Sequence, residues 1–247
     1  MAERHPKIRL PRTPPERVTW AQIGPEFMRT WGRPRGRVMA EHLEILGPTG
    51  SGKSYFEAHI LHERARRRGS HVVVIATKPA DETLTALGWP VIDRWPPSYR
   101  QDQVIFWPRT SSLGTEGMRK QRTAIMGVLQ KMWEPHSNRI VVFDEIAYLE
   151  HELKMKPILT RYYREARTLG ITIVASTQRP QGITRYMHSE STWAVFFAPK
   201  DEDDAERMAQ VAGNKHYFKE VFMELDRSKF EFVMVRNLTG ETYITHL

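Results

Sequence analysis

Residues 47–54 combine glycine, lysine and serine at a spacing that binds phosphate. The segment is a complete G-x-x-x-x-G-K-[ST] loop. In such a loop, backbone N–H groups surround the β-phosphate, the lysine reaches the β- and γ-phosphates, and the final hydroxyl binds Mg²⁺. A random chain of this length would carry the pattern at roughly the one per cent level, so we expect a nucleoside triphosphate site. The expected nucleotide-binding residues of the loop are Gly47, Pro48, Thr49, Gly50, Ser51, Gly52, Lys53 and Ser54.

Two carboxylates after a hydrophobic segment could complete a site for phosphate hydrolysis. Asp144 and Glu145 directly follow the apolar residues 140–143. Asp144 would join Ser54 as a metal ligand and hold Mg²⁺, usually through water. Glu145 would orient and polarise the attacking water. Nucleotide kinases and small GTPases generally lack this second carboxylate, which favours hydrolysis coupled to mechanical work. The alternative is a solvated acidic pair at the end of a strand.

A polar pair follows the next hydrophobic segment. Residues 171–176 lead into Thr177, Gln178, Arg179 and Pro180. A polar side chain at the tip of a strand beside Asp144 can contact the γ-phosphate or the attacking water and report hydrolysis to the rest of the domain. A Thr-Gln pair alone is a weak signal, and its position after the phosphate loop and the acidic pair strengthens it.

The elements that must position these groups alternate along the chain from Val38 onward. Strands alternating with helices predict an α/β fold, with a mostly parallel central sheet covered by helices on both faces. Residues 230–236 and 241–245 flank a turn sequence and predict a C-terminal β-hairpin. The predicted strands are 42–47, 71–76, 103–107, 139–144, 171–176 and 193–198, and the predicted helices are 53–68, 116–134, 157–169 and 202–212.

The first part of the chain differs from the rest in composition. Residues 1–37 are rich in proline and arginine and show little periodicity, whereas residues 38–247 carry the alternating pattern. We therefore expect a basic N-terminal arm followed by one motor domain. Within the arm, a short helical anchor is predicted by the spacing of Trp20, Ile23, Phe27 and Trp31.

The ordered array of motifs resembles the FtsK/HerA superfamily of DNA-pumping ATPases. The resemblance covers roughly residues 40–247 and is carried by residues 47–54, 142–145 and 167–180. It implies a RecA-like P-loop NTPase core in which Gln178 is the sensor glutamine and Arg167 acts on the nucleotide of a neighbouring subunit. The chain shows no membrane helices, winged-helix module or additional N-terminal β-barrel. A motor domain of this kind is most similar to viral genome-packaging ATPases and mobile-element translocases.

The predicted helix 157–169 also places three arginines on one side. Arg161, Arg164 and Arg167 recur every three residues, opposite an apolar face. One interpretation is a solvated basic face. The other is a subunit interface at which a guanidinium group reaches the adjacent γ-phosphate.

Composition narrows the choice of partners and of location. The formal net charge is +8, which favours polyanions, nucleic acid first, although a generally basic proteome would give the same excess. There is no cysteine, and therefore no disulfide, thiolate metal site or cysteine nucleophile. No apolar segment approaches the ~20 residues that cross a bilayer, and the N-terminus lacks a signal core. We expect a protein of the cytoplasm, or of the host cytoplasm if it is viral.

Together, the motifs and the resemblance predict an ATP- and Mg²⁺-dependent ATPase. It would act as a homo-oligomeric ring, with six subunits expected, and move double-stranded DNA for viral genome packaging or for plasmid or mobile-element transfer. Capsid or transfer-apparatus proteins would be further partners. One alternative is an ATPase for protein or virion assembly or secretion that does not move DNA. Another is a monomeric nucleotide-binding regulator or kinase, against which Glu145 argues.

Overall fold

The computed structural model describes residues 15–31, 41–67, 70–97, 101–110, 112, 114–178 and 183–247. Arg179 and Pro180 of the predicted site segment lie outside these described residues, as do residues 1–14 and 32–37 of the predicted arm. In the part of the chain that is described, no helix has both the length and the hydrophobicity needed to cross a membrane.

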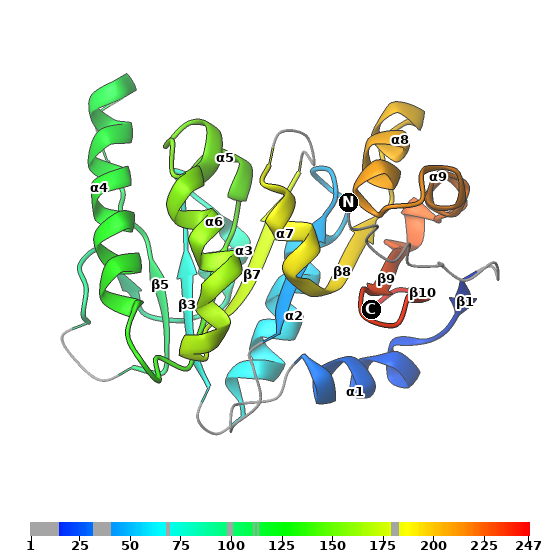
Figure 1. Cartoon of the computed structure of the whole chain (residues 1–247), viewed down its shortest axis with the longest axis horizontal. Coiled ribbons are helices and arrows are strands. Elements are labelled where there is room, and N and C mark those ends of the chain that lie inside the picture. Colours follow the sequence, from blue (N-terminus) through cyan, green and yellow to red (C-terminus); the bar gives the residue numbers. More distant parts are fainter. Residues whose placement is uncertain are drawn as a thin grey trace, which may run out of the picture.

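The described residues form one sheet of ten strands (Figure 1). The strands are Glu16–Arg17 (β1), His42–Leu46 (β2), His71–Ile75 (β3), Val91–Ile92 (β4), Gln103–Phe106 (β5), Arg139–Phe143 (β6), Thr172–Thr177 (β7), Ser191–Phe197 (β8), Phe232–Arg236 (β9) and Glu241–Thr245 (β10). Their order in the sheet is β1-β10-β9-β8-β2-β7-β6-β3-β5-β4. The strands from β8 to β4 in this order pair in parallel, and β8, β9 and β10 pair antiparallel.

Helices cover both faces of the sheet, as the continuous apolar strand sequences require. Alternate residues of one strand enter opposite cores: Val73 and Ile75 pack on one side, Val72 and Val74 on the other. The helices are Trp20–Thr30 (α1), Lys53–Ala65 (α2), Glu82–Ala86 (α3), Gly114–Met132 (α4), Ile146–His151 (α5), Lys156–Glu165 (α6), Arg185–Glu190 (α7), Glu202–Val211 (α8) and Lys215–Met223 (α9).

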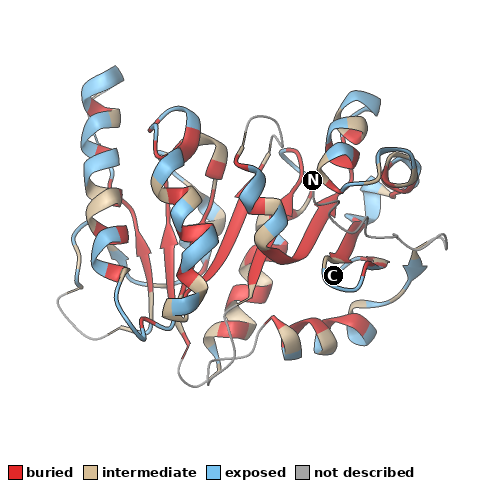
Figure 2. Ribbon diagram, in the orientation of Figure 1, coloured by how far each residue is buried: buried red, intermediate tan, exposed pale blue. Residues whose placement is uncertain are grey.

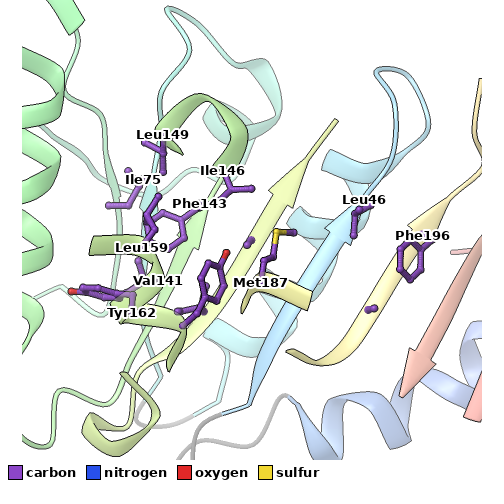
Figure 3. Packing of buried hydrophobic residues seen from close by; sticks show 14 of the residues in the cluster. Leu46, Ile75, Val141, Phe143, Ile146, Leu149, Leu159, Tyr162, Met187 and Phe196 are labelled. Carbon is purple, nitrogen blue, oxygen red and sulfur yellow. The ribbon is translucent and has the colours of Figure 1, made fainter. Parts of the chain in front are cut away.

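The two cores use different helices. Buried residues of α4 to α9 pack on the face shown in Figure 3, where Leu149, Leu159 and Met187 belong to the same cluster as Val141. Buried residues of α1 and α2 pack on the other face. Figure 2 shows the strands buried and the outward sides of the helices exposed. The α/β fold, its mostly parallel sheet and its C-terminal hairpin are therefore confirmed.

The N-terminal segment packs against the sheet. Trp20, Ile23, Phe27 and Trp31 lie along α1 and its end, and the rings of Phe27 and Trp31 stack with centroids 5.2 Å apart. β1 pairs in parallel with β10. The helical anchor is thus present, and the division at residue 37 stays a prediction.

The predicted helix 157–169 is wrong in its last part. The α-helix α6 ends at Glu165, and Ala166–Leu169 form a 3₁₀ turn that ends at Gly170. The amide of Ile171 then donates to the carbonyl of Ala166 at 3.1 Å, and β7 begins at the next residue. The tighter turn lets the chain reverse directly into the sheet.

Candidate functional site

Three neighbouring parallel strands bring the predicted site residues together at one edge of the sheet. β2 pairs with β7, and β7 pairs with β6, both in parallel. The phosphate loop follows β2, Asp144 and Glu145 follow β6, and Gln178 follows β7. Because the carboxyl ends of parallel strands meet at the same edge, residues far apart in the sequence converge there, as ligand sites of α/β sheets do.

The phosphate loop is shaped by two glycines with left-handed backbone conformations. Gly50 has φ of +80° and Gly52 has φ of +93°, a region that side chains disfavour. Gly52 directly precedes α2, which begins at Lys53. The free N–H groups and the positive end of this helix therefore face the loop, which suits a bound phosphate.

Lys53 lies inside the site in a defined position. Its side chain is buried, and Nζ donates to Ser176 Oγ of β7 at 2.9 Å. Burial raises the pKa of nearby Glu57 to about 7, and Lys53 acts in the opposite direction. The ammonium group of Lys53 is thus held among polar partners before any phosphate binds.

Asp144 is a buried carboxylate whose charge is balanced by a lysine. Burial raises its pKa above the ordinary value for aspartate, and the ammonium of Lys78 opposes this shift from 3.2 Å away. Lys78 also contacts Asp81 at 2.9 Å. Asp144 lines the same small hollow as Ser54 and Asp81. A buried carboxylate that needs a cation, beside a hydroxyl at a helix N-terminus, fits Mg²⁺ with its preference for oxygen ligands.

Glu145 is held by the tip of β7. Thr177 Oγ1 donates to one carboxylate oxygen at 2.8 Å, and the backbone N–H of Gln178 donates to the other at 3.2 Å. The side chain of Gln178 in turn accepts a hydrogen bond of 2.7 Å from Thr49 Oγ1 in the phosphate loop. One hydrogen-bonded path therefore runs from Glu145 through Gln178 to the loop.

Three residues at this edge were not among the predicted site residues. Ser176 binds Lys53, Lys78 binds Asp144, and Glu57 lies one helical turn after Lys53 on α2 with its carboxylate buried. The spacing of Lys53 and Glu57 was a readable signal, because residues four apart share a helix face. Ser176 and Lys78 depend on strand order, which the sequence alone left open.

Arg167 lies away from the other predicted site residues. It is in the 3₁₀ turn before β7, at the opposite edge of the sheet from Gln178. Burial lowers its pKa, and Glu190 and Glu41 oppose that shift. Among the described residues, its Nε has no hydrogen-bond partner. Its position gives Arg167 no role in the nucleotide site of its own chain.

The other two arginines of the predicted basic face have partners within the chain. Arg161 donates to Glu165 at 3.0 Å and lies over the ring of Trp133. Arg164 lies over the ring of Tyr186. These contacts favour the interpretation of Arg161 and Arg164 as a surface layer of the domain.

Comparison with known proteins agrees with this fold. The family model of the central domain of helicase HerA matches residues 36–75, which include β2, the phosphate loop, α2 and β3. No curated protein matches the chain by sequence.

Several solved structures share the fold. The genome packaging NTPase B204 from Sulfolobus turreted icosahedral virus 2, in complex with AMPPCP, aligns with a TM-score of 0.61 at 14% identity, over 84% of this chain and 97% of that one. VirB4 of Thermoanaerobacter pseudethanolicus aligns with a TM-score of 0.63 at 12% identity, over 87% and 91%. The pCW3 conjugation coupling protein TcpA, in its monomer form with ATPγS, gives 0.54 at 18%, over 83% and 59%.

These likenesses show the fold of the chain. The sheet order, the phosphate loop after β2 and the acidic pair after β6 are those of a P-loop NTPase. The chain has the fold of an FtsK/HerA-type P-loop ATPase.

Proposed function

We propose that this chain is a Mg²⁺-dependent ATPase that drives the translocation of double-stranded DNA as a homo-oligomeric ring. The observation that carries the proposal is the hydrogen-bonded path from Glu145 through Gln178 to Thr49. It joins the group that would activate water to the loop that would hold the γ-phosphate. Such a connection suits an enzyme that must pass the state of its nucleotide to the rest of the domain.

Each residue at the carboxyl edge has a defined part in this proposal. Residues 47–54 bind the phosphates, with Lys53 leaving Ser176 to reach the β- and γ-phosphates. Ser54 and Asp144 would hold Mg²⁺, which would supply positive charge beside the phosphate oxygens. Glu145 accepts a proton from the attacking water while Thr177 keeps it in place. Arg167 acts on the site of a neighbouring subunit.

DNA as the moved polymer is supported by charge and by likeness. The net charge of +8 favours a polyanion. A packaging NTPase is matched over 97% of its own length, and a conjugation coupling protein over 59%. We therefore place the activity in viral genome packaging or in mobile-element transfer, with a ring of six subunits.

ATP hydrolysis measured with and without duplex DNA tests the function. We expect DNA to stimulate the parent enzyme and to leave Glu145→Gln inactive with its ATP affinity intact. DNA affinity should be independent of sequence, and its logarithm should fall with log[salt] at a slope of ~ −0.9 per phosphate contact. Hydrolysis indifferent to DNA, with a flat salt response, would instead favour an ATPase for protein or virion assembly. A mass that stays monomeric with ATP and DNA would contradict the ring.

A further inference from the structure

A hollow with aromatic walls opens directly beside the phosphate loop. Its volume is about 380 Å³, within the range of small-molecule pockets. Gly52 of the phosphate loop and Tyr55 of α2, which directly follows the loop residue Ser54, both line this hollow. The remaining aromatic lining comes from Phe56, Phe197, Phe230 and Phe232.

The floor of the hollow is rigid. Phe56, Phe197 and Phe232 are buried, and each ring contacts the other two, with centroids 4.9 to 5.9 Å apart. They come from α2, β8 and β9, so three separate elements fix the floor. A flat apolar ligand could lie on it without rearranging the core.

Two further rings of the hollow are open to solvent, unlike most large aromatic side chains in the described chain. Tyr55 is 69% exposed and Phe230 is 54% exposed. Phe230 has φ of +54°, which is rare for a bulky residue. A turn fixes this conformation. The side chain of Asp226 accepts a hydrogen bond from the N–H of Ser228 at 2.9 Å, and the N–H of Phe230 donates to the backbone carbonyl of Arg227 at 3.2 Å.

Phe230 also lies against the phosphate loop itself. A Cβ atom added at Gly52 would lie 3.2 Å from the Cβ of Phe230. The missing side chain of Gly52 therefore leaves room for Phe230 at the start of α2. Tyr55 directly follows Ser54, the expected magnesium ligand. Any group in the hollow is thus within reach of a nucleotide whose phosphates occupy residues 47–54.

We propose that the hollow receives the base of the bound nucleotide, which stacks on Phe230 and Tyr55. This inference rests on the proposed function, because it requires a nucleoside triphosphate at the loop. Base–aromatic stacking gains affinity from the flat faces of both partners. The exposure of these two rings is explained by a ligand that covers them.

The same lining makes the site tolerant of different bases. Apart from the Tyr55 hydroxyl, the only polar side chain that lines the hollow among the described residues is Lys229, which pairs with Asp226 at 3.2 Å. Few groups remain to read the edge of a base by hydrogen bonding. We infer that ATP and GTP bind with affinities within about fivefold of each other, since discrimination of bases needs edge contacts.

Binding of three magnesium complexes tests the proposal: a non-hydrolysable ATP analogue, its GTP counterpart, and inorganic tripolyphosphate, which has no base. Phe230→Ala should weaken both nucleotides about 5- to 100-fold, which is the range of one lost stacking contact, and leave tripolyphosphate unchanged. Tyr55→Ala should act in the same direction. Phe230→Tyr, which keeps a ring, should restore binding, and Leu238→Ala, an exposed apolar residue of the β9–β10 turn, is the matched control.

Three results would overturn the base site. Equal weakening of nucleotide and tripolyphosphate by Phe230→Ala would mean that the ring only supports the loop. Unchanged nucleotide affinity in both ring variants would mean that the base lies elsewhere. Affinities for ATP and GTP that differ by more than about fivefold in the parent, in either direction, would refute the tolerance of bases. A parent protein that binds neither nucleotide nor tripolyphosphate would instead refute the proposed function, and the base site with it.

Discussion

The two edges of the central sheet carry different kinds of charged group. At the carboxyl edge, Lys53, Asp144 and Glu145 contact partners that are distant in sequence, and Asp144 lines a small hollow together with Ser54. At the amino edge, His42 is fully buried, and its ring bridges the backbone of two elements, accepting from Ile173 N–H at 3.0 Å and facing the Tyr163 carbonyl at 3.3 Å. The charged residues of the carboxyl edge can exchange their partners for a ligand, whereas His42 only connects elements of the fold.

Arg167 is the exception that makes this comparison useful. It lies at the amino edge, close to His42. Burial lowers the pKa of His42, and the positive charge of Arg167 lowers it further. Its Nε nevertheless has no hydrogen-bond partner among the described residues. An arginine that serves only the fold would be expected to use its donors there. The difference from His42 is what supports a role for Arg167 outside its own chain.

The largest expected effect comes from Arg167→Ala. If the guanidinium completes a neighbour's site, hydrolysis should fall by ~10³-fold or more, as for arginines supplied between GTPase partners. Nucleotide affinity and assembly should be unchanged. Turnover, nucleotide binding and mass would be measured for this variant and for Arg164→Ala, whose side chain lies over Tyr186 and should be dispensable.

Mixing subunits sharpens the same test. Arg167→Ala combined with Lys53→Ala should recover part of the activity, because some interfaces then pair an intact loop with an intact arginine. Normal hydrolysis by Arg167→Ala alone would mean that Arg167, like His42, serves only the fold of its own chain.

Glu145→Gln should have the next largest effect. Removing a general base costs ~10²- to 10⁴-fold in turnover, and the amide keeps the size of the side chain. Binding of ATP should persist, whereas Lys53→Ala should lose it because the ammonium at the β- and γ-phosphates is gone. Single-turnover hydrolysis and equilibrium binding distinguish the two variants. Parental turnover in Glu145→Gln would assign water activation to another group.

Acid should destabilise the protein through His42 at the amino edge of the sheet. Burial lowers the pKa of His42 to about 3, whereas an unfolded histidine titrates near 6.5. Below pH 6.5 the unfolded chain therefore takes up a proton that the native protein does not, and stability is lost as pH falls toward 3. Compared with His42→Asn, the parent should lose about 1.6 kcal/mol in free energy of unfolding between pH 6.5 and pH 5.

Denaturant unfolding at the two pH values measures this change. Taking the difference from His42→Asn removes the opposite contributions of Glu57 and Glu150, whose pKa values burial raises to about 7. His216→Gln, at an exposed position on α9, should follow the parent. The same loss in His42→Asn as in the parent would show that another group is responsible.

The smallest effect is expected from Thr49→Val, which removes only the hydrogen bond to Gln178. A net contribution of about 0.5–1.5 kcal/mol corresponds to roughly a 2- to 10-fold loss, and we expect it in DNA-stimulated hydrolysis while basal hydrolysis is nearly unchanged. Gln178→Ala should behave similarly, and the double variant should be no worse than either single one. Additive losses would mean that the two residues act separately.

The motif residues of the carboxyl edge could be predicted from the sequence, whereas the contacts of His42 at the amino edge could not. Lys53, Ser54, Asp144 and Glu145 lie in motifs because phosphate and metal chemistry requires fixed types at fixed spacings. The contacts of His42, Lys78 and Ser176 arise from strand neighbours that are distant in sequence, and no local pattern encodes them.

Secondary structure shows the same limit. The buried strands were readable from continuous apolar segments, and α2, α4 and α8 from their length. The helices α3, α5 and α7 have only five or six residues, too few for a helical period to be seen. The roles of Gln178 and Arg167 came from resemblance, and they remain predictions that the variants above decide.

The pairing of β1 with β10 has a consequence for the order in which the protein forms. Glu16 is opposite Tyr243, and Arg17 forms an ion pair with Glu231 at 2.6 Å. During synthesis, Glu16 and Arg17 therefore find their partners only after residues 231–244 have left the ribosome. Contacts of such high sequence separation form slowly. This strand is accordingly expected to dock as a late step of folding, after the phosphate loop and its neighbouring strands have already assembled.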